Sequence, residues 1–324
     1  MSKLKCTIIG GGSLGSYFAI KSSLSGYTTS LMTRNKENKI HINLLSEGRY
    51  YYGKVTNSYI DFAKPDVLVL AVKSYNLEST IIEYSSLIEN AKHILLLQSN
   101  PDLIFNNTLL DSPKVFLCPI LFCVVGNYKS IIVELNKGSI VFGSQHPQNE
   151  QSISDLNDFL NSITNTHYSK NISLDLFLKI IINSSLLPLS IIGGLNYGMA
   201  YATRNRLEYA ATIFDECLGL AKILFPEKNT VIFDKLLHNI DSNESLLILS
   251  NLIYRYHNVV PSIFFDLIKG KEITEIPYFY DKIILMGENK NINLIKLKNV
   301  SKLLNEHIAT GNILDEKHLN NMVM

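Results

Sequence analysis

One short stretch near the start of the chain constrains the fold more than any other. Residues 8–19, IIGGGSLGSYFA, carry the spacing G-x-G-x-x-G between an apolar run and an amphipathic one. In a strand-turn-helix unit, these glycines allow a tight turn, close approach of the backbone to a pyrophosphate, and close packing of helix on strand. The helix N-terminus adds free N–H groups and a partial positive charge. Glycines also serve plain turns, so the flanking patterns carry the prediction of a dinucleotide site. Its predicted residues are Gly10, Gly12, Ser13, Leu14 and Gly15.

The first half of the chain alternates strand and helix patterns. Apolar runs bounded by polar or turn residues predict strands at CTIIG, TTSLMTR, DVLVLAVK, HILLLQ and KVFLCPILF. This alternation is typical of a Rossmann-type, doubly wound parallel sheet covered by helices on both faces. Residues 130–144, SIIVELNKGSIVFGS, predict two short strands joined as a hairpin around Asn136-Lys137-Gly138, closing the sheet edge.

From about Leu174 onward the patterns are almost entirely helical. A chain of 324 residues is also long for a single hydrophobic core and suits two domains. The sequence therefore predicts an α/β protein with a dinucleotide-binding domain over residues 1–170 and an all-helical domain over residues 171–324.

Composition narrows the classes of partner. Apolar residues make up 46% of the chain and charged residues 18%, with a formal net charge of +1, which does not favour a nucleic-acid surface. The four cysteines show no metal-ligand spacing and suit a reducing cytoplasm, and no metal site is expected. No apolar run reaches the roughly twenty residues of a membrane span, so a soluble cytoplasmic protein is expected.

The end of the second predicted strand bears on which dinucleotide binds. NAD enzymes usually place an acidic residue there for the ribose 2′-hydroxyl, whereas this chain has Arg34, with Lys36 close by. A guanidinium matches a 2′-phosphate, which favours NADP(H). The alternative is that Arg34 is a solvated loop arginine without a role in cofactor binding. Lys73 follows the strand DVLVLAV at the ligand-binding edge, where a surface lysine is equally ordinary.

The apolar stretch LFLKIIINSSLLPLSIIGG carries two polar side chains on one helical face, Lys179 and Asn183. Burial of an ammonium group lowers its pKa towards neutrality unless a carboxylate restores the charge. Such a lysine exchanges a proton at physiological pH and can act in catalysis. The alternative is a lysine that reaches the surface and an asparagine that satisfies backbone groups.

Several segments in this order resemble the ketopantoate reductase (2-dehydropantoate 2-reductase) family. They are the glycine loop, VLAVKSYNLEST, LLLQSNP, LFLKIIINSSLLPLSIIGG and PSIFFDLIKGKEITEIPYFYDKII, spread from the first strand to the last helices. The resemblance implies a Rossmann domain that binds NADP and a helical domain, with the substrate between them. The implied reaction is NADPH-dependent reduction of the C2 ketone of ketopantoate to pantoate, in the biosynthesis of pantothenate and coenzyme A.

The resemblance also implies roles for individual residues. Lys179 matches the general acid that protonates the ketone oxygen, and Glu275 matches the glutamate that faces it and binds the substrate hydroxyl. Glu275 alone reads as an acidic residue in a helix first turn. Asn183 and Ser262 match substrate-binding residues. The cofactor contacts near the 2′-phosphate fall on Arg34 and Lys73.

Three departures from the family pattern lie on the substrate side. The family's Gln-Asn-Gly loop reads Gln98-Ser99-Asn100, which makes Ser99 or Asn100 the candidate contact. Leu187 replaces a second asparagine, and Pro277 and Tyr280-Asp281 replace an acid and Asn-Gly. Two alternatives therefore stay open: a reductase of another 2-oxo acid or of an imine, as in opine-type dehydrogenases, and a non-catalytic NADPH sensor. Members of the family are often dimers, so a homodimer is expected through the resemblance alone.

Overall fold

A computed structural model describes residues 4–34, 39–57, 64–105, 111–226, 230–232, 245–268, 275–310 and 319–320 of the chain. These residues form two compact units. Unit 1 comprises residues 1–98 and 106–173, and unit 2 comprises residues 99–105 and 174–324. The predicted division at residues 170 and 171 lies close to the second of these boundaries. The short segment 99–105, inside the predicted first domain, groups with the helical unit.

Unit 1 is built on a sheet with the strand order β7-β6-β5-β1-β2-β4-β3-β9-β8. Its first five strands in that order run parallel: β7 (Val115–Leu117), β6 (His93–Leu96), β5 (Val67–Leu70), β1 (Lys5–Ile9) and β2 (Thr28–Met32). The three central strands β1, β5 and β6 are short apolar runs buried along almost their whole length, as expected for parallel strands covered on both faces. The Rossmann-type sheet is confirmed.

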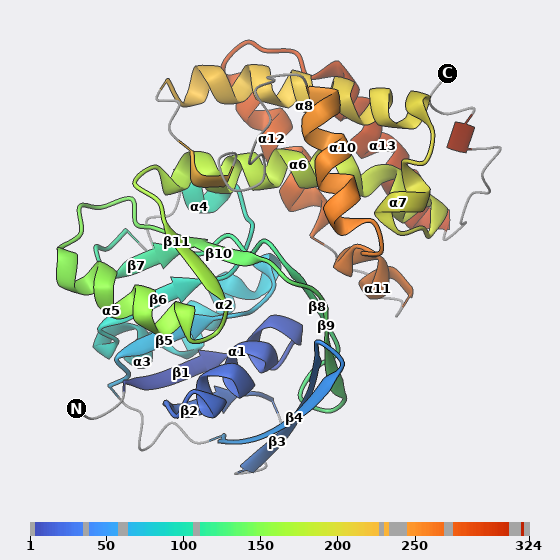
Figure 1. Cartoon of the computed structure of the whole chain (residues 1–324). Helices are drawn as coiled ribbons and strands as arrows, with labels where there is room; N and C mark the ends of the chain where they lie inside the picture. Colours follow the sequence, from blue (N-terminus) through green and yellow to red (C-terminus); the bar gives the residue numbers. More distant parts are fainter. Residues whose placement is uncertain are drawn as a thin grey trace. The chain divides into compact units, whose positions relative to one another are not determined.

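The remaining strands curve around α1 (Ser13–Leu24), as Figure 1 shows. They are β3 (Lys39–Ser46), β4 (Arg49–Thr56), β8 (Cys123–Val125) and β9 (Ile131–Asn136). Because strands lie on several sides of it, α1 buries Tyr17 and Phe18 as well as Ile20. The Tyr17 hydroxyl donates a hydrogen bond of 2.9 Å to Glu134 on β9, which ties the helix to the far strands.

Two hairpins differ from the sequence prediction. The β3–β4 hairpin, absent from the prediction, turns through Glu47 and Gly48, both with positive φ, which is the two-residue turn that suits the twist of paired strands. The hairpin predicted around Asn136-Lys137-Gly138 is wrong. β10 (Ser139–Phe142) pairs in parallel with β11 (Asn165–Tyr168), and β9 pairs with β3 and β8. Gly138 marks a close approach, since a Cβ there would lie 1.8 Å from the Leu121 oxygen.

Short helices complete unit 1. They are α2 (Leu77–Glu83), α3 (Ser85–Asn90) and α5 (Glu150–Asn161), with the 3₁₀ turn η2 (Ser74–Asn76). Asn149 caps α5 by accepting a hydrogen bond from the Ser152 amide. All four cysteines of the chain are free thiols.

Unit 2 is helical. Its elements are α4 (Asp102–Phe105), α6 (Ile172–Gly193), α7 (Tyr197–Ala200), α8 (Arg204–Leu224), α10 (Ser245–Tyr256), α11 (Ser262–Ile268), α12 (Ile276–Asn289) and α13 (Ile295–Thr310). α8 packs against α10 and α13, and α13 packs against α12. The Glu216 carboxylate of α8 accepts hydrogen bonds from the amides of Lys296 and Leu297 and so caps the start of α13.

The helix α6 is apolar and long enough to cross a membrane, yet 89% of its most apolar window is buried within the protein. Burial of this extent is the property of a core helix. Ser184 and Ser185 satisfy their hydroxyls by bonding carbonyls one turn back, at Ile180 and Ile181. These two serines are thus accommodated inside the apolar core.

Candidate active site

The glycine turn of unit 1 has the backbone that its spacing predicts. Gly10 follows β1 with φ of +114°, and a Cβ there would lie 2.6 Å from the Ala71 oxygen at the end of β5. A Cβ on Gly15 would lie 1.9 Å from the Gly10 oxygen, so only glycine lets α1 approach the turn this closely. By contrast, a Cβ on Gly12 would meet nothing within 4 Å. Gly12 therefore borders open space, where a pyrophosphate could approach the backbone.

The start of α1 suits an anion. Gly12 is the N-cap and supplies no side-chain cap, and the first turn contains no acidic residue. The first amide N–H groups of a helix have no partner within it, and here Ser13 and Leu14 carry two of them. The Ser13 hydroxyl donates to the Gly126 oxygen at 2.6 Å, which fixes the turn from the neighbouring loop. These features fit the pyrophosphate of a dinucleotide cofactor.

The two predicted cations of the cofactor site lie at the carboxyl edge of the two parallel strands that flank β1. Arg34 follows β2 and is exposed, and Lys73 follows β5 and is half-buried. β1 lies between these strands, so both residues share the sheet edge of the glycine turn. Lys36, named with Arg34, lies outside the described residues.

Tyr128 belongs to the same site but was not predicted from the sequence. A Cβ on Gly11 would lie only 2.6 Å from the Tyr128 ring. The loop between β8 and β9 therefore packs on the glycine turn. Lys129 places its ammonium 5.7 Å from the Tyr128 ring centroid. The sequence signal for this loop is the glycine at position 126, which has a φ of +92°. Its partner in the glycine turn, Ser13, lies more than a hundred residues away in the sequence.

The loop after β6 divides its residues between the two units. Gln98, in unit 1, donates from Nε2 to the Val72 oxygen at 3.0 Å, which braces the end of β5. Ser99 and Asn100 belong to unit 2. Asn100 is buried, and its Oδ1 accepts a hydrogen bond of 3.0 Å from the Asp102 amide. This oxygen therefore stabilises the start of α4, and the Nδ2 group is the donor that Asn100 offers to another partner.

Lys179 and Glu275 interact within unit 2. Lys179 lies half-buried on α6, and Glu275 is the N-cap residue of α12. Burial lowers the pKa of Lys179 to about 8, and the negative charge of Glu275 opposes that shift. A lysine with such a pKa is mostly protonated at neutral pH and releases its proton readily, as a general acid requires.

The other predicted substrate residues of unit 2 differ in position and burial. Asn183 lies one helical turn from Lys179 on α6 and is half-buried, while Leu187, another turn on, is buried. Ser262 is the exposed first residue of α11. The structure thus brings together Lys179 and Glu275 and keeps Asn183 on the same helix face.

Asp102 and Lys282 add an ion pair that the sequence did not indicate. The Lys282 ammonium lies 3.1 Å from Asp102 Oδ2, and the two side chains are 38% and 28% exposed. This contact joins α4, which follows Ser99 and Asn100, to α12, whose N-cap residue is Glu275. A partly exposed pair of this kind contributes little stability, so it marks where α4 and α12 meet and does not by itself hold the loop.

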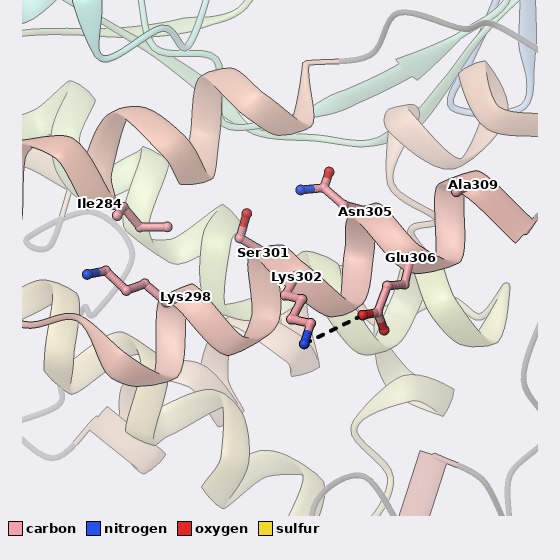
Figure 2. Close-up of a pocket in the computed structure, with 7 residues that line it drawn as sticks. All are labelled: Ile284, Lys298, Ser301, Lys302, Asn305, Glu306 and Ala309. Atoms are coloured by element: carbon pink, nitrogen blue, oxygen red, sulfur yellow. Dashed lines mark ion pairs between the residues drawn. The ribbon is translucent and has the colours of Figure 1, made fainter.

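A separate pocket is lined by residues of α12 and α13, and Figure 2 shows these residues in close-up. Its lining includes Ile284, Ser301 and Asn305, together with an ion pair between Lys302 and Glu306. None of the predicted site residues lines it. Among the described residues, no cluster of three histidine, cysteine or acidic side chains could hold a metal ion.

Both units match models of one protein family. A family model described as "Ketopantoate reductase PanE/ApbA" matches residues 6–102, and its C-terminal counterpart matches residues 171–307. Together they span more than half of the chain. The chain belongs to the ketopantoate reductase family. It is therefore an NAD(P)-dependent oxidoreductase of the ketopantoate reductase type, and this type of enzyme reduces small 2-oxo acids.

Individual relatives of this family member are distant. A 2-dehydropantoate 2-reductase of Aquifex aeolicus is 23% identical over 93% of this chain and 96% of its own length. A PanE/ApbA family ketopantoate reductase from Ralstonia eutropha has a TM-score of 0.73 at 18% identity, covering 95% of this chain and 99% of that one. D-mandelate dehydrogenase, solved with NADH and anilino(oxo)acetate, has a TM-score of 0.79 at 20% identity with the same coverage. These solved structures share the fold of this chain.

Proposed function

We propose that this family member is an NADPH-dependent 2-dehydropantoate 2-reductase that forms pantoate for pantothenate and coenzyme A biosynthesis in the cytoplasm. The observation that carries the proposal is the pair Lys179 and Glu275, with the pKa of Lys179 near 8. A lysine tuned in this way is suited to donate a proton to a ketone oxygen at neutral pH. The matching Aquifex aeolicus enzyme carries the same activity in its name.

Residues of unit 1 hold the cofactor in this proposal. The backbone around Gly12 and the first amides of α1, at Ser13 and Leu14, bind the pyrophosphate, while Gly10 and Gly15 keep the turn close enough. Arg34 and Lys73 bind the 2′-phosphate, which distinguishes NADPH from NADH. When bound, the reduced nicotinamide supplies the hydride for the ketone carbon.

Residues of unit 2 handle the proton and the substrate. Negative charge that develops on the ketone oxygen is neutralised by a proton from the Lys179 ammonium. Glu275 keeps that ammonium charged and accepts a hydrogen bond from the substrate hydroxyl. Asn183 and Ser262 donate to the substrate, with Ser99 or the Nδ2 group of Asn100 in place of the family's loop asparagine.

Reduction of a different 2-oxo acid is the second candidate. It is favoured by the buried leucine at position 187, where the family has an asparagine, and by the fold shared with D-mandelate dehydrogenase. An apolar side chain on the substrate helix accepts an aromatic or aliphatic acid better than it accepts a hydroxylated one. Oxidation of NADPH at 340 nm with ketopantoate, beside NADH and a panel of 2-oxo acids, separates the candidates. Turnover confined to another acid contradicts ketopantoate, and cofactor binding without turnover of any acid points to a sensor.

The quaternary structure belongs to the same proposal. One solved relative is a dimeric ketopantoate reductase from Staphylococcus aureus, with a TM-score of 0.66. We propose a homodimer for this chain. Light scattering coupled to size exclusion measures its mass directly against the 36.5 kDa of one chain.

We predict that the rate of ketone reduction falls as pH rises through about 8. The folded-state pKa of Lys179 is about 8, lowered from 10.5 by burial, and Glu275 is the charged group that acts on it. Below that pH the ammonium donor is present, and above it the donor is lost tenfold per pH unit. Oxidation of the product needs the neutral amine and should rise over the same range. Profiles of kcat/KM for both directions test this, and an inflection left near 10 in either direction contradicts it.

We predict that Arg34→Ala weakens NADPH binding about tenfold or more while leaving NADH binding nearly unchanged. The lost contact is a charge-assisted bond to the 2′-phosphate, which NADH lacks. Fluorescence titration with both cofactors measures the change. Arg49→Ala is the matched control, because Arg49 is exposed at the start of β4, away from the carboxyl edge. An equal loss for both cofactors would place Arg34 outside 2′-phosphate recognition.

A further inference from the structure

A proline interrupts α6 nine residues after Lys179. Pro188 has no amide N–H, so the Ser184 carbonyl, four residues earlier, has no helical donor. Its donor is instead the hydroxyl of Tyr280, at 2.9 Å. A second tyrosine serves the adjacent carbonyls, since the Tyr201 hydroxyl lies 3.1 Å from the Ser185 oxygen and 2.9 Å from the Leu186 oxygen.

Both tyrosines are buried, with exposed fractions of 0% for Tyr280 and 6% for Tyr201. Burial raises the pKa of each phenol well above its usual value, so the hydroxyls stay protonated and donate over the whole physiological range. A buried carbonyl without a donor is costly, so the Tyr280 hydroxyl replaces the one bond that Pro188 removes, and the Tyr201 hydroxyl adds a donor for the next two carbonyls. The two contacts differ in which element they fasten to α6.

Tyr280 fastens the helix that carries Glu275. Ser184 lies five residues beyond Lys179 on α6, and Tyr280 lies five residues beyond Glu275 on α12. Five residues correspond to about 7.5 Å along each helix axis, so this hydrogen bond joins the two helices a little more than one turn from the lysine and the glutamate. Tyr201 follows α7 and fastens that segment instead.

We propose that Tyr280 is a positioning residue, which uses the Ser184 carbonyl freed by Pro188 to set α12 against α6 and so hold Glu275 opposite Lys179. The inference rests on the proposed roles of Lys179 and Glu275. Tyr280 stands where the family resemblance leads one to expect an asparagine, and only a longer side chain with a terminal donor makes this contact. The departure from the family pattern thereby acquires a physical role.

The test compares Tyr280→Phe with Tyr201→Phe. Each variant removes one buried hydroxyl from the same stretch of α6, so each should lower Tm by several degrees. Only Tyr280→Phe should also lower the pKa of Lys179, because Glu275 then opposes the effect of burial less effectively. With it, kcat/KM at neutral pH should fall on the order of tenfold, with NADPH affinity unchanged. Lys179 is titrated by its pH-dependent rate of amine labelling, read by mass spectrometry, which does not require turnover.

Pro188→Ala separates satisfaction of the carbonyl from positioning. This substitution restores a backbone N–H that can donate to the Ser184 carbonyl, so Tyr280→Phe should lose much less Tm in that background while still shifting the Lys179 titration. The double variant also carries the test if Tyr280→Phe alone does not fold. A Lys179 titration that is equal in Tyr280→Phe and Tyr201→Phe overturns the inference. A shifted titration in a protein that reduces no 2-oxo acid upholds the inference and removes the proposed function.

Discussion

Lys179→Met is expected to lower kcat for ketone reduction by about two to four orders of magnitude. Methionine keeps the length of the side chain but carries no proton to donate, so the developing oxyanion is left without a partner. NADPH affinity should stay nearly intact, because the residues that bind the cofactor belong to unit 1 and Lys179 belongs to unit 2. Steady-state kinetics and a fluorescence titration with NADPH measure the two quantities separately.

The same substitution should raise the stability of the protein. Because the folded state lowers the pKa of Lys179 to about 8, holding the ammonium charged at neutral pH costs free energy. Below pH 8 that cost is fully present, and it is relieved between about 8 and 10.5 as the folded protein releases the proton first. Removing the charge should therefore stabilise the fold at pH 7 by at most about 3 kcal/mol. Chemical denaturation at pH 7 gives the difference.

Lys302→Met is the matched control for this experiment. Lys302 is 78% exposed on α13, and its contact is a 3.9 Å pair with Glu306 one turn away. Its removal should change neither turnover nor stability by a measurable amount. Wild-type turnover in Lys179→Met would remove the lysine from the mechanism. An equal gain of stability in both variants would contradict the cost assigned to the buried charge.

Local signals predicted the parts of this protein that depend on nearby residues. The glycine turn is one, because Gly10 and Gly15 meet each other within the strand-turn-helix unit of β1 and α1. The carboxyl-edge position of Arg34 follows in the same way from a strand boundary. The β3–β4 hairpin was missed although its turn residues, Glu47 and Gly48, stand between two alternating runs.

Contacts between distant residues were beyond that reasoning. The strand at Ser139–Phe142 was predicted correctly, but its partner β11 follows a helix, and no local pattern distinguishes that pairing from a hairpin. Lys179 was singled out by its own segment, whereas Glu275 entered only through the resemblance, since 96 residues separate the two. Tyr280 donates to a backbone carbonyl, and the Tyr128 ring packs against a glycine. Because other side chains of suitable length could make either contact, the sequence does not indicate them.

Gly15→Ala is expected to destabilise unit 1 by several kcal/mol, and Gly12→Ala is expected to leave its stability within about 0.5 kcal/mol. At Gly15 the added Cβ would lie 1.9 Å from the Gly10 oxygen and 3.1 Å from the Ala71 Cβ. The closest of these atoms belongs to the backbone, so α1 must move away from β1 to admit the methyl group. At Gly12 the φ of −74° suits alanine, and the new methyl group meets nothing.

For NADPH binding, the variant with wild-type stability, Gly12→Ala, should be the impaired one. In Gly12→Ala the methyl group occupies the open space in front of the helix N-terminus, where the pyrophosphate must approach the backbone. NADPH affinity should therefore fall about tenfold or more in a protein that unfolds at the wild-type denaturant concentration. Urea unfolding and NADPH titration of both variants measure these effects. Wild-type affinity in Gly12→Ala would mean that the pyrophosphate binds elsewhere, and wild-type stability in Gly15→Ala would contradict the close packing of α1 on the turn.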